Sequence, residues 1–206
     1  MNIRCTPSHL HGEIDINAND SSIIFLLCAG ALSEEGITLK GFKADGFAAE
    51  ILDTLDYMGA NVSRDNDNIT VSKGRLFGMS KRIKESELEF FVYCALGAVC
   101  EKGFIQLSGL RSIKKETVDL TVTAFSKLNI ACSFDDDDEL IIWGGNDITG
   151  GTADANGNIY LALALTVISC EASIPLDIYN TSGLEKTFAD YMNKFNSLGG
   201  KIETIK

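Results

Sequence analysis

Proline is scarce in this chain of 206 residues, which contains only two. The scarcity excludes a Pro-rich linker between domains, and the length is near the upper end for one domain with a substantial core. No stretch of about 18 consecutive apolar residues is present, so no transmembrane helix is predicted. Residues 1–7 also lack the apolar core of a signal peptide. We therefore expect no membrane association.

Positively charged residues are also few. Lys and Arg number 18 against 29 Asp and Glu, which gives a formal net charge of −11. Nucleic acids and anionic membranes bind to basic faces, so no nucleic-acid partner is expected. A small basic pocket for a phosphate is still compatible with this charge. Hydrophobic residues at 45% and charged residues at 23% are typical of a globular protein.

Cysteine pairs of the CxxC type are absent, although six cysteines occur. Most of them lie in apolar runs, which favours free, buried thiols in a reducing cytosol over a disulfide framework or a metal site. We therefore predict a cytoplasmic protein without a bound metal. The cysteines are Cys5, Cys28, Cys94, Cys100, Cys132 and Cys170.

A repeat with a period of about 70 residues is the main positive feature of the sequence. Gly59, Asn129 and Gly199 recur at this interval, each between an apolar helical stretch and a segment rich in strand formers. Gly and Asn tolerate the left-handed backbone just past a helix, so a helix is predicted to end at each of them. The units cover about 12–75, 76–145 and 146–206 of a single domain, 1–206.

Each unit contains two predicted helices. The first helix is apolar nearly all round, which predicts burial at the domain centre, and the second carries an apolar stripe at helical spacing. The first helices are predicted at Ser22–Ala31, Glu89–Val99 and Ile159–Ile168, and the second at Phe47–Met58, Thr117–Leu128 and Phe188–Leu198.

Short strands complete each unit in the order β-α-β-α-β-β. The third unit lacks its last strand, and we expect Ile14–Ile16 to replace it. Because no unit can bury both of its helices alone, the three must share one core. We predict an α/β (α+β) fold with buried helices inside and sheets outside. The other strands are predicted at Ile37–Leu39, Phe104–Leu107 and Ile174–Tyr179, with hairpins of Asn61–Ser63 with Ile69–Ser72 and Ala131–Phe134 with Leu140–Trp143.

Three local motifs, together with this plan, resemble one lobe of the enolpyruvyl transferases, above all the 5-enolpyruvylshikimate-3-phosphate synthase family. Asn19-Asp20-Ser21-Ser22 is similar to the family's Gly-Asp-x-Ser-Ser. The segment Leu110-Arg111-Ser112-Ile113-Lys114-Lys115-Glu116-Thr117 resembles Leu-Arg-x-Lys-Glu-Thr-Asp-Arg. Lys186-Thr187-Phe188-Ala189-Asp190-Tyr191 resembles Lys-Thr-Phe-Pro-Asp-Tyr. The resemblance covers nearly the whole chain and fits the C-terminal half of the synthase.

The segment 6–14, however, is similar to the beginning of a full-length synthase. Internal symmetry of the family would produce this double likeness, and so would a deletion that joined the N-terminus to the second half.

The resemblance implies transfer of the enolpyruvyl group of phosphoenolpyruvate to shikimate 3-phosphate, with no metal or organic cofactor. It implies proton transfer by Glu116, phosphate contact by Lys115 and phosphoenolpyruvate contact by Lys186. Glu89 stands where the family has an Asp that acts on the target hydroxyl. Substrate contact by Ser21, Ser22 and Arg111 is also implied, because they lie in the matching motifs. The simpler alternative for all of these residues is a solvated or capped helix start.

Several cations of the family pattern are missing. Its Asp-Arg after Lys-Glu-Thr is Val118-Asp119 here, and its Asp-His-Arg is Asn156-Gly157-Asn158. Each lost charged contact would cost about 2–4 kcal/mol of binding or transition-state stabilisation. The family site also lies between two lobes, so a single lobe needs a complementary lobe or a second copy. We therefore expect the isolated chain to be inactive.

Two hypotheses follow. The chain is half of a carboxyvinyltransferase, or it is a noncatalytic relic that binds an anionic ligand or a protein partner. Two charged segments are expected to have no catalytic role: Lys81, Arg82 and Lys84 form a surface patch, and the acidic run 135–139 is a solvated hairpin turn.

Overall fold

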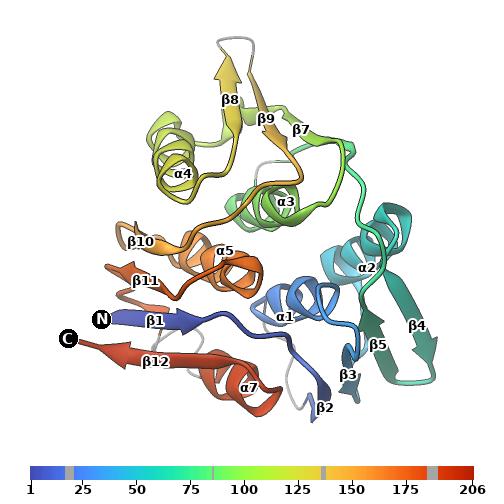
Figure 1. The fold of residues 1–206 in the computed structure, drawn as a ribbon. Helices are drawn as coiled ribbons and strands as arrows, with labels where there is room; N and C mark the ends of the chain where they lie inside the picture. The colour runs from blue at the N-terminus through green and yellow to red at the C-terminus, as the bar shows by residue number, and fades with distance from the viewer. Residues whose placement is uncertain (17–20, 85, 136–137, 185–189) are drawn as a thin grey trace.

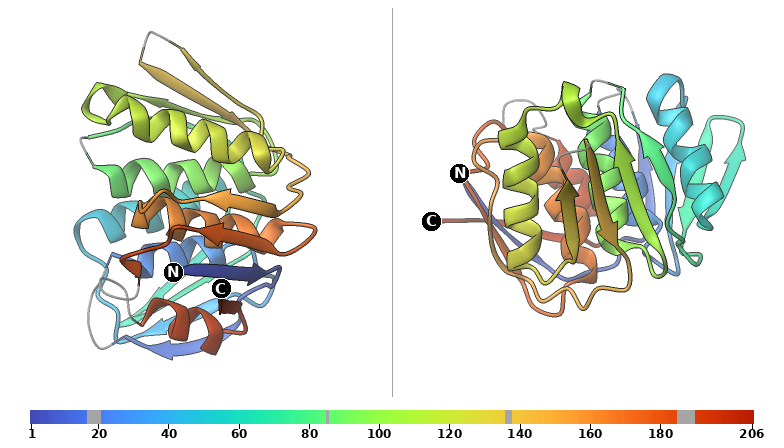
Figure 2. Two further views of the ribbon diagram at one scale, coloured as in Figure 1. Left: turned by 90° about the vertical axis from the view of Figure 1, so that its left-hand side faces the viewer. Right: turned by 90° about the horizontal axis from the view of Figure 1, so that it is seen from above.

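Three four-stranded sheets surround a central group of helices in the computed structural model of this protein (Figure 1). The structure describes residues 1–16, 21–84, 86–135, 138–184 and 190–206. The central helices are α1 (Ile23–Gly30), α3 (Glu87–Val99) and α5 (Ile159–Ile168), and they lie side by side (Figure 2). Helices α2 (Gly46–Met58), α4 (Lys115–Lys127) and α7 (Tyr191–Ser197) lie nearer the outside.

The central helices are buried on every side. All residues of α1 are buried, as are those of α3 from Glu89 onward and those of α5 from Leu161 onward. A helix without a polar face is stable only when it is covered from all directions. The predicted burial is therefore confirmed, and the predicted ends differ by no more than two residues. None of the helices in the described ranges has the length and apolarity needed to cross a bilayer.

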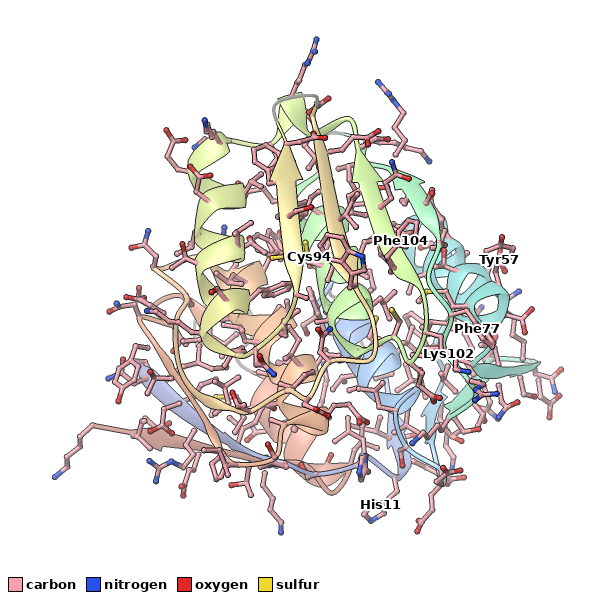
Figure 3. All side chains as sticks on the ribbon, turned by 45° about the horizontal axis from the view of Figure 1, so that its top comes forward. His11, Tyr57, Phe77, Cys94, Lys102 and Phe104 are labelled. Carbon is pink, nitrogen blue, oxygen red and sulfur yellow. The ribbon has the colours of Figure 1, made fainter. Side chains whose placement is uncertain are left out.

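Each sheet supplies one apolar face to this centre. Along β7 (Phe104–Ser108), residues Ile105 and Leu107 are buried against the helices, whereas Phe104 is 44% exposed. Figure 3 shows Cys94 of α3 beneath the second sheet and Phe104 on its outer surface. The alternation is the period-two pattern of a sheet with one covered face.

The three sheets have the same strand order and pairing. The first pair in each is parallel and the next two pairs are antiparallel, which confirms the predicted repeat of the β-α-β-α-β-β plan. The sheets are β2 (Gly12–Asp15), β3 (Ile37–Lys40), β5 (Asn68–Ser72) and β4 (Asn61–Asp65); β6 (Ser80–Arg82), β7 (Phe104–Ser108), β9 (Glu139–Trp143) and β8 (Cys132–Asp135); and β10 (Gly151–Asp154), β11 (Leu176–Tyr179), β1 (Asn2–Thr6) and β12 (Lys201–Ile205).

The strand that completes the third sheet is β1, so the prediction of Ile14–Ile16 is wrong. Strand β1 lies between β11 and β12, and Ile3 is opposite both Ile178 and Thr204. Ile14 instead pairs with Leu39 in the first sheet, because Gly12–Asp15 is the opening strand of the first unit. The two ends of the chain therefore lie in the same sheet (Figure 1).

The repeated turn residues have the predicted backbone conformation. The φ angles are +107° at Gly59, +61° at Asn129 and +86° at Gly199. Gly59 is needed for a second reason, because a Cβ there would lie 2.4 Å from the carbonyl oxygen of Arg75.

Other boundaries shift for local reasons. Helix α3 begins at Glu87 because the Ser86 hydroxyl accepts the N–H of Glu89 at 3.3 Å and caps the helix. Strand β11 begins at Leu176 because Pro175 has no N–H for the ladder. The predicted beginning of the last helix, Phe188, lies outside the described residues, and α7 is described from Tyr191.

Replacing Ile3 with Ala tests whether β1 is integral to the third sheet. Ile3 is fully buried, and truncation to Ala at such a site costs about 2–5 kcal/mol of the free energy of unfolding. Urea denaturation followed by circular dichroism should show this loss. Glu203→Ala, at an exposed position of the neighbouring β12, should change stability by less than about 0.5 kcal/mol. Equal effects of the two substitutions would contradict the packing of β1.

Candidate functional site

Helix N-terminal ends meet at one end of the molecule. A cavity of about 220 Å³ is lined there by residues at the beginnings of α1, α2 and α3, namely Ser21, Ile24, Phe47, Ala48 and Leu88. The C-terminal ends of α1 and α3 meet at a second cavity, lined by Ala31, Leu32 and Val99. The central helices α1 and α3 therefore have the same polarity.

Glu87 connects the first turns of α3, α4 and α5. Its carboxylate accepts hydrogen bonds from Thr117 Oγ1 at 3.2 Å and from Asn158 Nδ2 at 3.2 Å. Asn158 in turn caps α5 by accepting the N–H groups of Tyr160 and Leu161, at 3.0 and 3.1 Å. Five helix beginnings thus converge on one end, which carries the positive ends of their dipoles. We call this the N-terminal face of the lobe.

Lys81 lies between two carboxylates beside this face. Its ammonium donates a hydrogen bond to Glu50 Oε1 and lies 3.6 Å from Glu89 Oε1. Its side chain is only 15% exposed, and the ammonium is 5.0 Å from the centroid of the Tyr93 ring. The other oxygen of Glu89 accepts the backbone N–H of Lys84 at 2.7 Å, which ties the end of β6 to α3.

The Lys81 cluster perturbs the titration of its members. The hydrogen bond from Lys81 is the main cause that lowers the pKa of Glu50 below its ordinary value. Burial alone would lower the pKa of Lys81, but its hydrogen bonds to Glu50 and Tyr93 outweigh burial and raise it. Burial raises the pKa of Tyr93, whose hydroxyl is within 3.1 Å of Thr54 Oγ1. Lys81 and Glu50 are therefore charged near neutral pH, while Tyr93 is neutral.

Two open cavities at this end are lined by lysine and arginine side chains. The larger, of about 750 Å³, is lined by Arg82, Lys84 and Arg111 together with Ile83, Gly109, Ser112 and Asp138. Its neighbour, of about 430 Å³, is lined by Arg111, Lys114 and Lys115. Asp138 lies on both walls, 3.8 Å from Arg111. Both cavities suit anions of small-molecule size.

The structure distributes the predicted site residues over this end without bringing all of them together. Arg111 and Lys115 line the same cavity, and Glu116 is exposed in the first turn of α4. Ser21 lines a different cavity, at the beginnings of α1 to α3. Lys186 lies outside the described residues.

Two predicted residues are buried. Ser22 occupies the N-cap position of α1 and is fully buried, and its hydroxyl makes no capping bond to the helix. Glu89 is only 4% exposed, and its Oε1 has no hydrogen-bond partner within the described part of the chain. In this conformation the Glu89 carboxylate faces the Lys81 ammonium and the backbone N–H of Lys84, just after β6.

The prediction that Lys81, Arg82 and Lys84 form a surface patch is wrong for Lys81. Arg82 and Lys84 are exposed, but Lys81 points inward between the carboxylates. Alternation along β6 is the signal that would have separated them, since neighbouring strand residues face opposite sides. The sequence does not predict a role for Glu50 or Glu87 at the site, because their hydrogen-bond partners lie about 30 residues or more away along the chain.

The remaining expectations concern the acidic turn and the cysteines. Asp135 at the end of β8 pairs with Glu139 at the beginning of β9, which agrees with the predicted hairpin, and residues 136–137 of the acidic run lie outside the described residues. All six cysteines are free thiols, and burial raises the pKa of Cys5 to about 12. Among the residues that the structure describes, no three His, Cys, Asp or Glu side chains are grouped so as to hold a metal ion.

Replacing Lys81 with Met tests the Lys81 cluster. The change leaves two carboxylates without their shared cation, and we expect a loss of about 2–4 kcal/mol in the free energy of unfolding. Lys84→Met removes the same charge from a side chain that is 71% exposed, and should cost less than about 1 kcal/mol. The double variant K81M/E89Q should recover part of the loss. Equal stabilities of K81M and K84M would contradict the arrangement.

The lowered pKa of Glu50 gives a second prediction, on pH. Because the folded state holds this pKa below the unfolded value near 4.5, Glu50 stabilises the fold above that pH. Its contribution is lost as the pH falls through the folded pKa. Glu50→Gln should therefore make the acid-side decline in stability shallower, measured by thermal unfolding from pH 6 to roughly pH 3. Parallel curves for the variant and the wild type would contradict it.

Comparison with known proteins agrees with the fold. Residues 1–195 match the EPSP synthase (3-phosphoshikimate 1-carboxyvinyltransferase) family. The 3-phosphoshikimate 1-carboxyvinyltransferase of Natronomonas pharaonis is 28% identical over 94% of this chain and 45% of its own length. That of Clostridium kluyveri is 26% identical over 98% of this chain and 48% of its own length.

Solved structures of enolpyruvyl transferases have the same fold over most of this chain. EPSP synthase from Acinetobacter baumannii superposes with a TM-score of 0.71 at 19% identity, over 93% of this chain and 47% of that one. The enolpyruvyl transferase NikO from Streptomyces tendae superposes with a TM-score of 0.72 at 20% identity, over 89% of this chain and 43% of that one. The chain thus spans about half the length of its relatives and has the fold of a single lobe. It belongs to the EPSP synthase family.

Proposed function

We propose that this lobe forms one wall of a carboxyvinyltransferase active site that a second lobe completes. The observation that carries the proposal is the N-terminal face, where five helix beginnings converge beside two cation-lined cavities. Such an end attracts anions through helix dipoles and through lysine and arginine side chains. The names of the relatives indicate 3-phosphoshikimate as the acceptor, and the family resemblance implies phosphoenolpyruvate as the donor; both are anions.

In this proposal Lys115 and Arg111 contact substrate phosphate from the cavity that they share. Glu116 transfers protons, because its exposed position in the first turn of α4 leaves the carboxylate accessible to a substrate held between two lobes. Lys186 and Ser21 contact substrate as the resemblance implies, and Ser22, which is fully buried in the single lobe, does so only after a rearrangement. No cofactor takes part, and the protein acts in the cytoplasm.

Glu89 takes part only after a rearrangement. Its carboxylate is buried in the single lobe, where Oε1 lies 3.6 Å from the Lys81 ammonium and accepts no hydrogen bond from the residues that the structure describes. Closure of a second lobe against the N-terminal face would have to move the β6 end, which holds Glu89 through the Lys84 N–H. We therefore propose that the isolated chain is inactive.

The second candidate function is a noncatalytic lobe that binds an anionic ligand or a protein partner. The inward position of Glu89 favours it, and so does Asn158, which stands in place of a family cation and is engaged in capping α5. The two candidates differ in whether any pairing of lobes restores turnover.

Phosphate release from phosphoenolpyruvate and shikimate 3-phosphate tests the proposal. The chain is assayed alone, over a range of concentrations that would reveal a dimer, and with the half of the Clostridium kluyveri relative that it does not match. We expect turnover only with the complementary lobe. No turnover in any combination, with both lobes shown to be folded by circular dichroism, would favour the noncatalytic function.

Lys115→Gln tests the assigned phosphate contact. Loss of one charged contact should weaken phosphoenolpyruvate binding to the two-lobe mixture about tenfold in calorimetric titration. Lys127→Gln removes the same charge from the last turn of the same helix, far from its beginning, and should change binding less than about twofold. Equal weakening by both variants would contradict a specific role for Lys115.

A further inference from the structure

The family resemblance implies a substrate contact for only one residue of the larger cation-lined cavity, Arg111. The other residues that line this cavity have no role assigned by the resemblance. Arg82 and Lys84 come from the end of β6 and the residues after it, Arg111 and Ser112 from the turn after β7, and Asp138 from the hairpin of β8 and β9. Strands β6 and β7 are parallel neighbours, so their carboxyl ends lie at the same edge of the sheet. In α/β sheets such edges are the usual location of ligand sites.

The turn after β7 is shaped to approach Arg82 closely. Gly109 has a φ of +77°, and a Cβ at this position would lie 3.2 Å from Arg82 Cγ and 3.0 Å from the Ile83 carbonyl oxygen. The N–H of Ile83 also donates to the Ser108 carbonyl at 2.9 Å, which continues the pairing past the end of β6. The wall that carries Arg82 is thus fixed against the wall that carries Arg111.

The cations of this cavity are available to a ligand. Arg82 has no ion pair with any of the described residues, and it is exposed. Lys84 is 71% exposed and lies 3.4 Å from Glu50, and Arg111 is 84% exposed and lies 3.8 Å from Asp138. Ion pairs as open as these contribute little, so an incoming anion can replace the carboxylates.

The chemistry of the lining selects a compact phosphate group. Guanidinium groups bind phosphate through two parallel N–H bonds, and this cavity has two of them with a lysine. Its volume of about 750 Å³ suits a small molecule. A long polyanion is disfavoured, because the net charge of −11 would repel it outside the cavity.

We infer that this cavity binds the phosphate group of a small molecule through Arg82, Lys84 and Arg111, with Asp138 as an internal competitor for the same cations. The binding requires neither catalysis nor a second lobe. It therefore goes beyond the proposed function, and the two can fail separately: phosphate release with the complementary lobe tests one, and anion binding to the single chain tests the other.

The test is a titration of the ¹⁵N-labelled full chain, followed through its backbone amide signals. The probes are inorganic phosphate and glycerol 3-phosphate, with sodium chloride at matched ionic strength as the blank. We expect saturable shifts of the Ile83, Gly109 and Ser112 amides with both probes and none with chloride. Tighter binding of glycerol 3-phosphate identifies a phosphate ester as the ligand, and equal affinity identifies free phosphate.

Three variants make the test specific. Arg82→Gln should weaken binding about tenfold, because one charged contact is lost. Asp138→Asn should tighten it a few-fold by removing the competing carboxylate. Arg64→Gln, which removes the same charge from a 49% exposed side chain on β4, should leave it unchanged. Equal weakening by R82Q and R64Q would overturn the inference, as would shifts confined to other parts of the chain.

Discussion

The structure depends on the burial of three helices that have no polar face. Helices α1, α3 and α5 contact one another and present apolar side chains in every direction, so each must be covered by something else. One four-stranded sheet covers only part of this surface. The three sheets are therefore required together, and the hydrophobic core runs through all of them as one cluster.

The same constraint places the candidate functional site at one end of the lobe. Each unit begins with a strand that leads into a central helix, so equivalent units leave the helix beginnings at one end of the molecule. The helix dipoles make the electrostatic potential at this end positive. The Glu87 carboxylate connects three helix beginnings there, and Arg111 and Lys115 line the adjoining cavity. The core thus determines where the helix beginnings converge, and the proposed anion contacts depend on individual side chains at that end.

Much of the fold was predictable from the sequence, because it follows from local signals. The turn residues Gly59, Asn129 and Gly199 and the uniformly apolar helices gave the repeat and the layers. The site was less predictable, because its key contacts join residues far apart in the sequence, such as Lys81 with Glu50 and Glu87 with Asn158. The role of β1 was missed for the same reason, since it pairs with strands near the other end of the chain.

If the three units share one core, they must unfold together. The single tryptophan, Trp143 on β9, reports on the second sheet, whereas far-ultraviolet circular dichroism reports on the whole chain. Both signals should follow one coincident urea transition, with the calorimetric enthalpy equal to the van't Hoff enthalpy. Separate transitions for tryptophan fluorescence and circular dichroism would contradict a shared core.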